Sequence, residues 1–165
     1  MAGQTTSRRV TLTNMGSGKE AADRLKQQAA ERQQKLNESF KRGMQIDQNR
    51  QGNWDALLAA LRTNVEEFTE SFPPAKSQQL GASLLNPNNL TVSTQVQPII
   101  KIEVLRDYRE SGVQADITRQ KGWDFTQSRT PVYAFTVDGF SDGQRSFTPK
   151  ELAAELFAFI EEFFG

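Results

Sequence analysis

The hydrophobic positions of this chain follow two different periods, which divide it into a helical first part and a sheet-forming second part. Up to Pro73, apolar residues recur every three or four positions, the period of an amphipathic helix. From Val92 they alternate with polar residues, the period of a strand. A helical period returns after Pro149. The pattern therefore predicts an α+β protein.

Two helices are expected before the sheet. The first, over 18–42, is rich in good helix formers, but its apolar stripe is thin and is interrupted by Arg32. Gly43 and Gly52 are expected to separate it from the second helix, with Asn53 as the N-cap. We predict that the two helices form an antiparallel hairpin joined by the connector at 41–53.

The second helix has a wide apolar face, which we call the apolar ridge. Its spacing of 4, 3, 4, 3 and 4 residues is that of nearly three heptads. The thin first helix offers too little surface to cover it, so we expect a second copy or another protein to bind there. The residues of the ridge, and hence the predicted partner-binding residues, are Trp54, Leu58, Leu61, Val65, Phe68 and Phe72.

The second part of the chain reads as a small antiparallel sheet with a helix packed on it. Strands are expected over 92–104, with a break at Pro98, and over 113–117 and 132–137. Thr148 and Glu151 have the spacing of a capping box, so the C-terminal helix should begin at Pro149. The predicted organisation is a flexible arm (1–16), a helical hairpin (17–73), a linker (74–89) and an α+β domain of at least three strands (90–165).

The amino-acid composition excludes several common classes of catalytic site. The chain of 165 residues contains no His and no Cys. Zinc sites of the Cys/His type, thiol nucleophiles and Ser-His-Asp triads are therefore ruled out. No constellation of the remaining reactive side chains stands out. We expect no catalytic residue, no cofactor and no metal site, and hence a protein that is not an enzyme.

The segment GSGK at 16–19 resembles the tip of a phosphate-binding loop. That motif requires a glycine five residues before Gly18 and a hydroxyl residue after Lys19, but Thr13 and Glu20 occupy these positions. Ser17 and Glu20 instead have the spacing of a capping box. The segment is therefore interpreted as a helix start, with phosphate contact at a bare helix N-terminus as the alternative.

Charge is unevenly distributed along a chain whose formal net charge is zero. Residues 1–50 contain ten Lys or Arg and five Asp or Glu, a net charge of +5, and the remainder carries −5. A basic arm is typical of sequence-blind nucleic-acid binding, although carboxylates are interspersed in the first helix. The candidate nucleic-acid contacts are Arg8, Arg9, Lys19, Arg24, Lys26, Lys35, Lys41 and Arg42.

Two other groups of residues are interpreted as structural features and not as binding or catalytic sites. Glu66, Glu67 and Glu70 are expected to be solvated on the polar side of their helix. The aromatic loop at 123–125 is expected to fold back over the end of the sheet, with a binding tip as the alternative.

These observations predict a non-enzymatic assembly or adaptor protein that binds a protein partner or itself through the apolar ridge. A nucleic-acid-associated protein is the alternative. Because the N-terminus lacks a continuous apolar run and no segment is long and apolar enough for a membrane span, a cytoplasmic location is expected.

Overall fold

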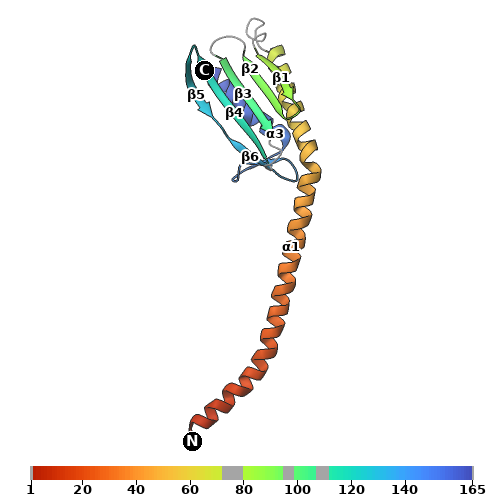
Figure 1. Ribbon diagram of the computed structural model, residues 1–165, viewed down its shortest axis with the longest axis vertical. Coiled ribbons are helices and arrows are strands. Elements are labelled where there is room, and N and C mark those ends of the chain that lie inside the picture. Colours follow the sequence, from red (N-terminus) through yellow and green to blue (C-terminus); the bar gives the residue numbers. More distant parts are fainter. Residues whose placement is uncertain (1, 72–79, 95–98, 107–111, 165) are drawn as a thin grey trace. The chain divides into compact units, whose positions relative to one another are not determined.

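The computed structural model describes the backbone of residues 2–71, 80–94, 99–106 and 112–164, and the side chains among them except those of 2–16, 121, 124–127, 163 and 164. One long helix, α1 (Ala2–Ser71), precedes an eight-stranded antiparallel sheet, and helix α3 (Pro149–Phe164) follows it (Figure 1). The strands are β1 (Leu80–Asn86), β2 (Asn89–Thr94), β3 (Ile99–Arg106), β4 (Gly112–Lys121), β5 (Asp124–Arg129), β6 (Val132–Phe135), β7 (Phe140–Ser141) and β8 (Ser146–Phe147). The predicted α+β class is confirmed.

The predicted helical hairpin is wrong, because α1 continues through both glycines that were expected to interrupt it. A glycine inside a helix costs only about 1 kcal/mol, which neighbouring contacts can offset. Arg50 forms an ion pair with Asp47 at 2.7 Å. Asn53, the expected N-cap, lies inside the helix and donates a hydrogen bond to the backbone oxygen of Thr136 at 3.3 Å. Contacts with the sheet region therefore hold this stretch helical.

The chain divides into two units, Met1–Met44 and Gln45–Gly165. The first unit is helical over 2–44, a range that includes most of the arm expected over 1–16. The expected linker also contains a strand, β1, which pairs with β2 across a turn at 87–88. Asn86 Oδ1 accepts a hydrogen bond from the backbone nitrogen of Asn88 at 2.9 Å, as in an Asx turn. This turn therefore joins β1 and β2 into a hairpin.

Within the second unit, the strand order is β1-β2-β3-β4-β6-β7-β8. The long strand β4 pairs with two partners: its first residues with β6 and its last with β5. The turn between β4 and β5 uses Gly122 at a φ of 63°, a conformation that other residues rarely adopt. β5 occupies part of the segment that the sequence predicted as a loop.

The core lies between one face of the sheet and two helical segments, the C-terminal part of α1 and α3. Alternate residues of the central strands face this core, and Val92, Ile102 and Ile117 form a row across β2, β3 and β4. From α3, Leu152 and Leu156 are fully buried against the same core. The predicted N-cap is confirmed at the start of α3, where Thr148 Oγ1 accepts a hydrogen bond from the backbone nitrogen of Glu151 at 3.2 Å.

Candidate partner-binding surfaces

The apolar ridge of α1 is covered by its own chain. Trp54, Leu61 and Val65 are 0%, 1% and 7% exposed, and Leu58 and Phe68 are partly buried against the same core. The expectation that the ridge lacks cover is therefore wrong, since the sheet and α3 cover it in place of a paired helix. Phe72 lies outside the described residues.

Trp54 anchors the ridge to the β1–β2 turn. Its indole ring is fully buried, and its Nε1 donates a hydrogen bond to the backbone oxygen of Pro87 at 2.9 Å. A buried indole needs such a partner because an unsatisfied donor in the core is costly. The heptad spacing selected Leu58, whereas Leu57 is the fully buried neighbour. This region is therefore structural core.

Several apolar residues are exposed in the first unit, on the segment of α1 from Ser17 to Met44, which we call the exposed segment. In the second unit the exposed large apolar residues lie on β1, on β6 and at the β4–β5 turn: Leu84, Leu85, Val132 and Trp123. The large apolar side chains of the exposed segment, Leu25, Leu36 and Phe40, are 65%, 64% and 70% exposed. Leu36 and Phe40 are one turn apart, and Leu25 and Ala29 continue the stripe at helical spacing. We call this row the exposed stripe. The sequence predicted this stripe on the first helix of a hairpin, but α1 is one continuous helix and the stripe is exposed.

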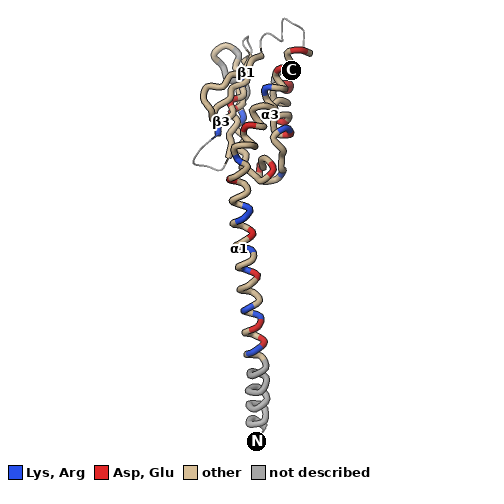
Figure 2. The backbone as a smooth tube through the Cα atoms, turned by 90° about the vertical axis from the view of Figure 1, so that its right-hand side faces the viewer, with Lys and Arg blue, Asp and Glu red and all other residues tan. Residues whose placement is uncertain are grey.

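Charges are arranged in order around the exposed stripe. One residue is roughly 100° of rotation in an α-helix and two residues are roughly 200°, the opposite side. Basic residues stand one position from the stripe: Arg24 and Lys26 beside Leu25, Lys35 beside Leu36 and Lys41 beside Phe40. Acidic residues stand two positions from it: Asp23 from Leu25, Glu31 from Ala29 and Glu38 from Leu36. The stripe thus has basic flanks and a mainly acidic back, with Arg32 inside the stripe and Arg42 two positions from Phe40 as exceptions. Figure 2 shows both charges along this segment.

Six of the eight candidate nucleic-acid contacts fall on the same segment. The side chains of these six are exposed, and within the described residues none of the six forms an ion pair. Arg8 and Arg9 lie in α1, but their side chains are outside the description. The described members of the set are Lys19, Arg24, Lys26, Lys35, Lys41 and Arg42.

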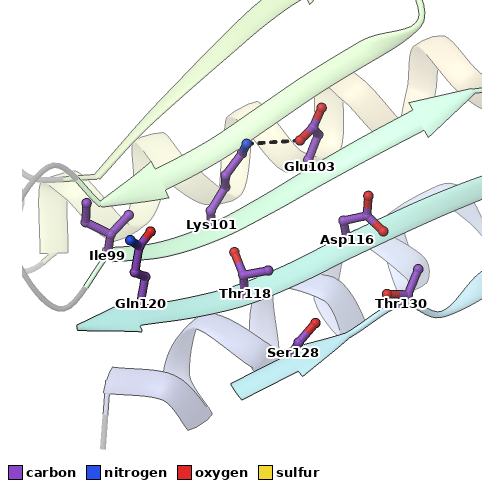
Figure 3. Close-up of a pocket in the computed structure, with 8 residues that line it drawn as sticks. All are labelled: Ile99, Lys101, Glu103, Asp116, Thr118, Gln120, Ser128 and Thr130. Atoms are coloured by element: carbon purple, nitrogen blue, oxygen red, sulfur yellow. Dashed lines mark ion pairs between the residues drawn. The ribbon is translucent and has the colours of Figure 1, made fainter. Parts of the chain in front are cut away.

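A second surface is the polar face of the sheet, opposite the helices. A hollow of about 500 Å³ lies over β3, β4 and β5 (Figure 3). Lys101 and Glu103 form an ion pair at 3.0 Å, and Asp116 stands directly across from Glu103 in the β3–β4 register. The lining is otherwise made mainly of hydroxyl and amide side chains: Thr118, Gln120, Ser128 and Thr130.

Glu103 is held in its charged form. Asn89 Nδ2 donates a hydrogen bond to its Oε1 at 2.9 Å, and this bond together with Lys101 lowers the pKa of Glu103 from its ordinary value of 4.5. A carboxyl group with a lowered pKa is a poor general acid at neutral pH. The arrangement can accept hydrogen bonds, but it offers no evident acid-base pair.

Three further predictions concern Ser17, Trp123 and the glutamates near the end of α1. Ser17 lies inside α1, so its predicted role as an N-cap is wrong, and the GSGK segment is helical. Trp123 is 97% exposed at the β4–β5 turn, so the expectation that this side chain folds back over the sheet is also wrong. Glu66, Glu67 and Glu70 are exposed, as predicted.

Among the described residues, no group of three or more Asp or Glu is placed to hold a metal ion. No described helix has a stretch long and apolar enough to cross a membrane. Comparisons with protein-family models, with curated proteins and with solved structures found no match to this chain. The chain's own surfaces therefore provide the basis for a functional proposal.

Proposed function

We propose that the chain is a non-enzymatic assembly protein that binds a protein partner through the exposed segment of α1. The observation that supports this proposal is the exposed stripe, in which Leu25, Leu36 and Phe40 are each more than 60% exposed. An isolated helix is marginally stable in water, and most helical stability comes from packing of an apolar face. A partner that covers the stripe supplies that packing.

The flanking charges indicate the chemistry of the partner. Residues 17–44 contain seven Lys or Arg and four Asp or Glu, a net charge of +3, and the acidic residues lie mainly away from the stripe. A partner in contact with the stripe therefore meets apolar side chains bordered by Lys26 and Lys35. An apolar surface with an acidic rim is complementary to both features.

The experiment compares two double variants of the full chain. Leu36→Ser/Phe40→Ser removes the stripe, and Gln27→Ser/Gln34→Ser makes the same kind of change on the opposite face, because these glutamines stand two residues from Leu25 and Leu36. We expect the first variant to lose the association that wild type shows in light scattering or in co-purification of a stoichiometric partner. The second should retain it. Equal association by both variants would contradict the proposal.

A nucleic-acid partner is the second candidate, favoured by the exposed and unpaired cations of the same segment. Phosphate binding would weaken steeply with salt. Fluorescence anisotropy with random DNA and RNA at two salt concentrations tests it. Absence of binding at low salt would exclude this candidate, and binding that survives Lys26→Gln/Lys35→Gln would count against these contacts.

A further inference from the structure

A groove between the C-terminal parts of α1 and α3 has the features expected of a helix-binding site. Four residues of α1 and four of α3, each set at the spacing i, i+3, i+4 and i+7, line a space of about 500 Å³. The C-terminal part of α1 and all of α3 belong to the second unit. The lining residues are Asn64, Glu67, Phe68, Ser71, Ala154, Phe157, Ala158 and Glu161.

The floor of this groove is apolar and only partly buried. The rings of Phe68 and Phe157 meet edge to face, with 5.7 Å between their centroids. Ala154 and Ala158 are exposed beside them. Since the distance between packed helices depends on the side chains at the contact, two alanines allow another helix to approach closely. The groove can therefore receive large apolar side chains from a helix outside it.

The rim of the groove carries negative charge. Glu67 and Glu161 line it, and Ser71 at the end of α1 lies in the same groove as Glu161 near the end of α3. The negative ends of two helix dipoles thus meet at one site. Cations normally stabilise such ends. Neither helix has a basic residue of its own in its last turn, and the cation near the end of α3 is Arg129 of β5, which pairs with Glu162, outside the groove lining, at 3.2 Å. Helix ends that lack basic residues of their own, beside an apolar groove, are typical of a binding surface.

We propose that this groove binds the exposed segment of a second copy of the chain. The inference rests on the proposed function, because it names the partner of the exposed stripe. An apolar stripe with basic flanks, Lys26 and Lys35, complements an apolar floor with an acidic rim. Two exposed segments paired side by side would instead bring these basic flanks close together, which is unfavourable.

The contact joins two different surfaces of the chain. If each of two copies places its exposed segment in the groove of the other, the result is a closed dimer. If each copy binds only the next copy, the result is a ring or a longer assembly. In both cases each copy contributes one segment and one groove. Reversing the charge of either surface should therefore weaken assembly, and reversing both should restore it.

The test uses charge-reversal variants of the full chain, whose self-association is measured by sedimentation over a concentration series. Glu67→Lys/Glu161→Lys reverses the groove and Lys26→Glu/Lys35→Glu reverses the segment. We expect each variant alone to raise the dissociation constant at least roughly tenfold, a difference of about 1.4 kcal/mol. An equimolar mixture, or the quadruple variant, should recover association. Glu66→Lys/Asp138→Lys alters the same number of exposed carboxylates outside the groove lining and should change little.

The outcomes separate the two proposals. If the segment variants weaken assembly and the groove variants do not, the groove proposal is overturned and the proposed function stands. If wild type remains a monomer and only a different protein or an added anionic vesicle binds the segment, the second copy is excluded as the partner. If the groove variants weaken assembly but the mixture does not recover it, charge complementarity is excluded as the basis of the contact. Circular dichroism checks that all variants keep the wild-type fold.

Discussion

Leu61 and Leu36 both stand in apolar stripes of helical period on α1, but Leu61 is 1% exposed and Leu36 is 64% exposed. The residues around Leu61 pack against the sheet and α3, and Trp54 adds a hydrogen bond to the β1–β2 turn. Around Leu36, the described contacts are local hydrogen bonds such as Gln34 Nε2 to Glu38 Oε1 at 3.3 Å. The same secondary structure is thus stabilised in two different ways.

This difference shows where each part of α1 obtains its free energy. Burial of apolar side chains stabilises the part from Gln45 onward by tertiary packing. The exposed segment depends on helix propensity and on one-turn side-chain pairs, each worth only a few tenths of a kcal/mol. We therefore expect the second part to fold with the sheet and the first to gain order when its stripe is covered.

The largest predicted effect is at Trp54. Trp54→Ala removes a fully buried ring and its hydrogen bond to Pro87, so the free energy of unfolding should fall by about 3–5 kcal/mol. Urea unfolding followed by circular dichroism measures it. Trp123→Ala is the matched control, because this tryptophan is 97% exposed, and it should change the free energy by less than about 0.5 kcal/mol. Similar losses for both variants would contradict the assigned core.

A matched pair of leucines tests the comparison directly. Leu61→Ala should lower the free energy of unfolding by about 2–5 kcal/mol, because it leaves a cavity in the core. Leu36→Ala should change it by less than about 0.5 kcal/mol in dilute, monomeric protein. Chemical denaturation at low protein concentration gives both values. A loss at Leu36 as large as that at Leu61 would mean that the exposed stripe is covered within its own chain.

The two glycines of α1 should respond differently. An added Cβ meets nothing within 4 Å at either Gly43 or Gly52. Gly52→Ala, in the part that packs on the sheet, should raise the free energy of unfolding by about 1 kcal/mol. Gly43→Ala should increase helicity in the far-ultraviolet spectrum with little change in global unfolding, since its surroundings are not packed. Equal stabilisation by both would show that α1 unfolds as one cooperative element.

The smallest predicted effect is the pH response of the sheet face. Because the folded pKa of Glu103 lies below 4.5, its contribution is fully present above that value and is lost as pH falls through the folded pKa. Glu103→Gln should cost about 1 kcal/mol at pH 7 and should flatten the loss of stability on acidification. Thermal unfolding from pH 7 to pH 3 measures this. An unchanged acid response in the variant would contradict the role of Asn89 and Lys101.

Local sequence patterns predicted the α+β class, several strands and the start of α3, because each depends on neighbouring residues. The N-cap at Thr148 and the alternation in β3 are of this kind. The edge strand β1 was missed because most of its residues are exposed, which removes the alternation that marks a half-buried strand. The continuity of α1 was missed because distant contacts, such as Asn53 with Thr136, override the local preference of glycine.

The candidate site was harder to predict because it also depends on contacts between residues that are distant in the sequence. Heptad spacing identified a face of α1 that must be covered, but it could not distinguish cover by a partner from cover by the sheet. The spacing of Leu25, Leu36 and Phe40 was visible in the sequence, and so were the basic residues one position away. Only the fold shows that this thinner stripe is the exposed one.

Hydrogen exchange of the full chain over a concentration series tests the central claim most directly, namely that residues 17–44 find no cover within their own chain. The account predicts that their amides exchange rapidly in dilute monomer and become protected as copies associate. Amides of residues 54–65 should exchange slowly at every concentration. Protection of residues 17–44 equal to that of 54–65 in the most dilute, monomeric sample would contradict the account.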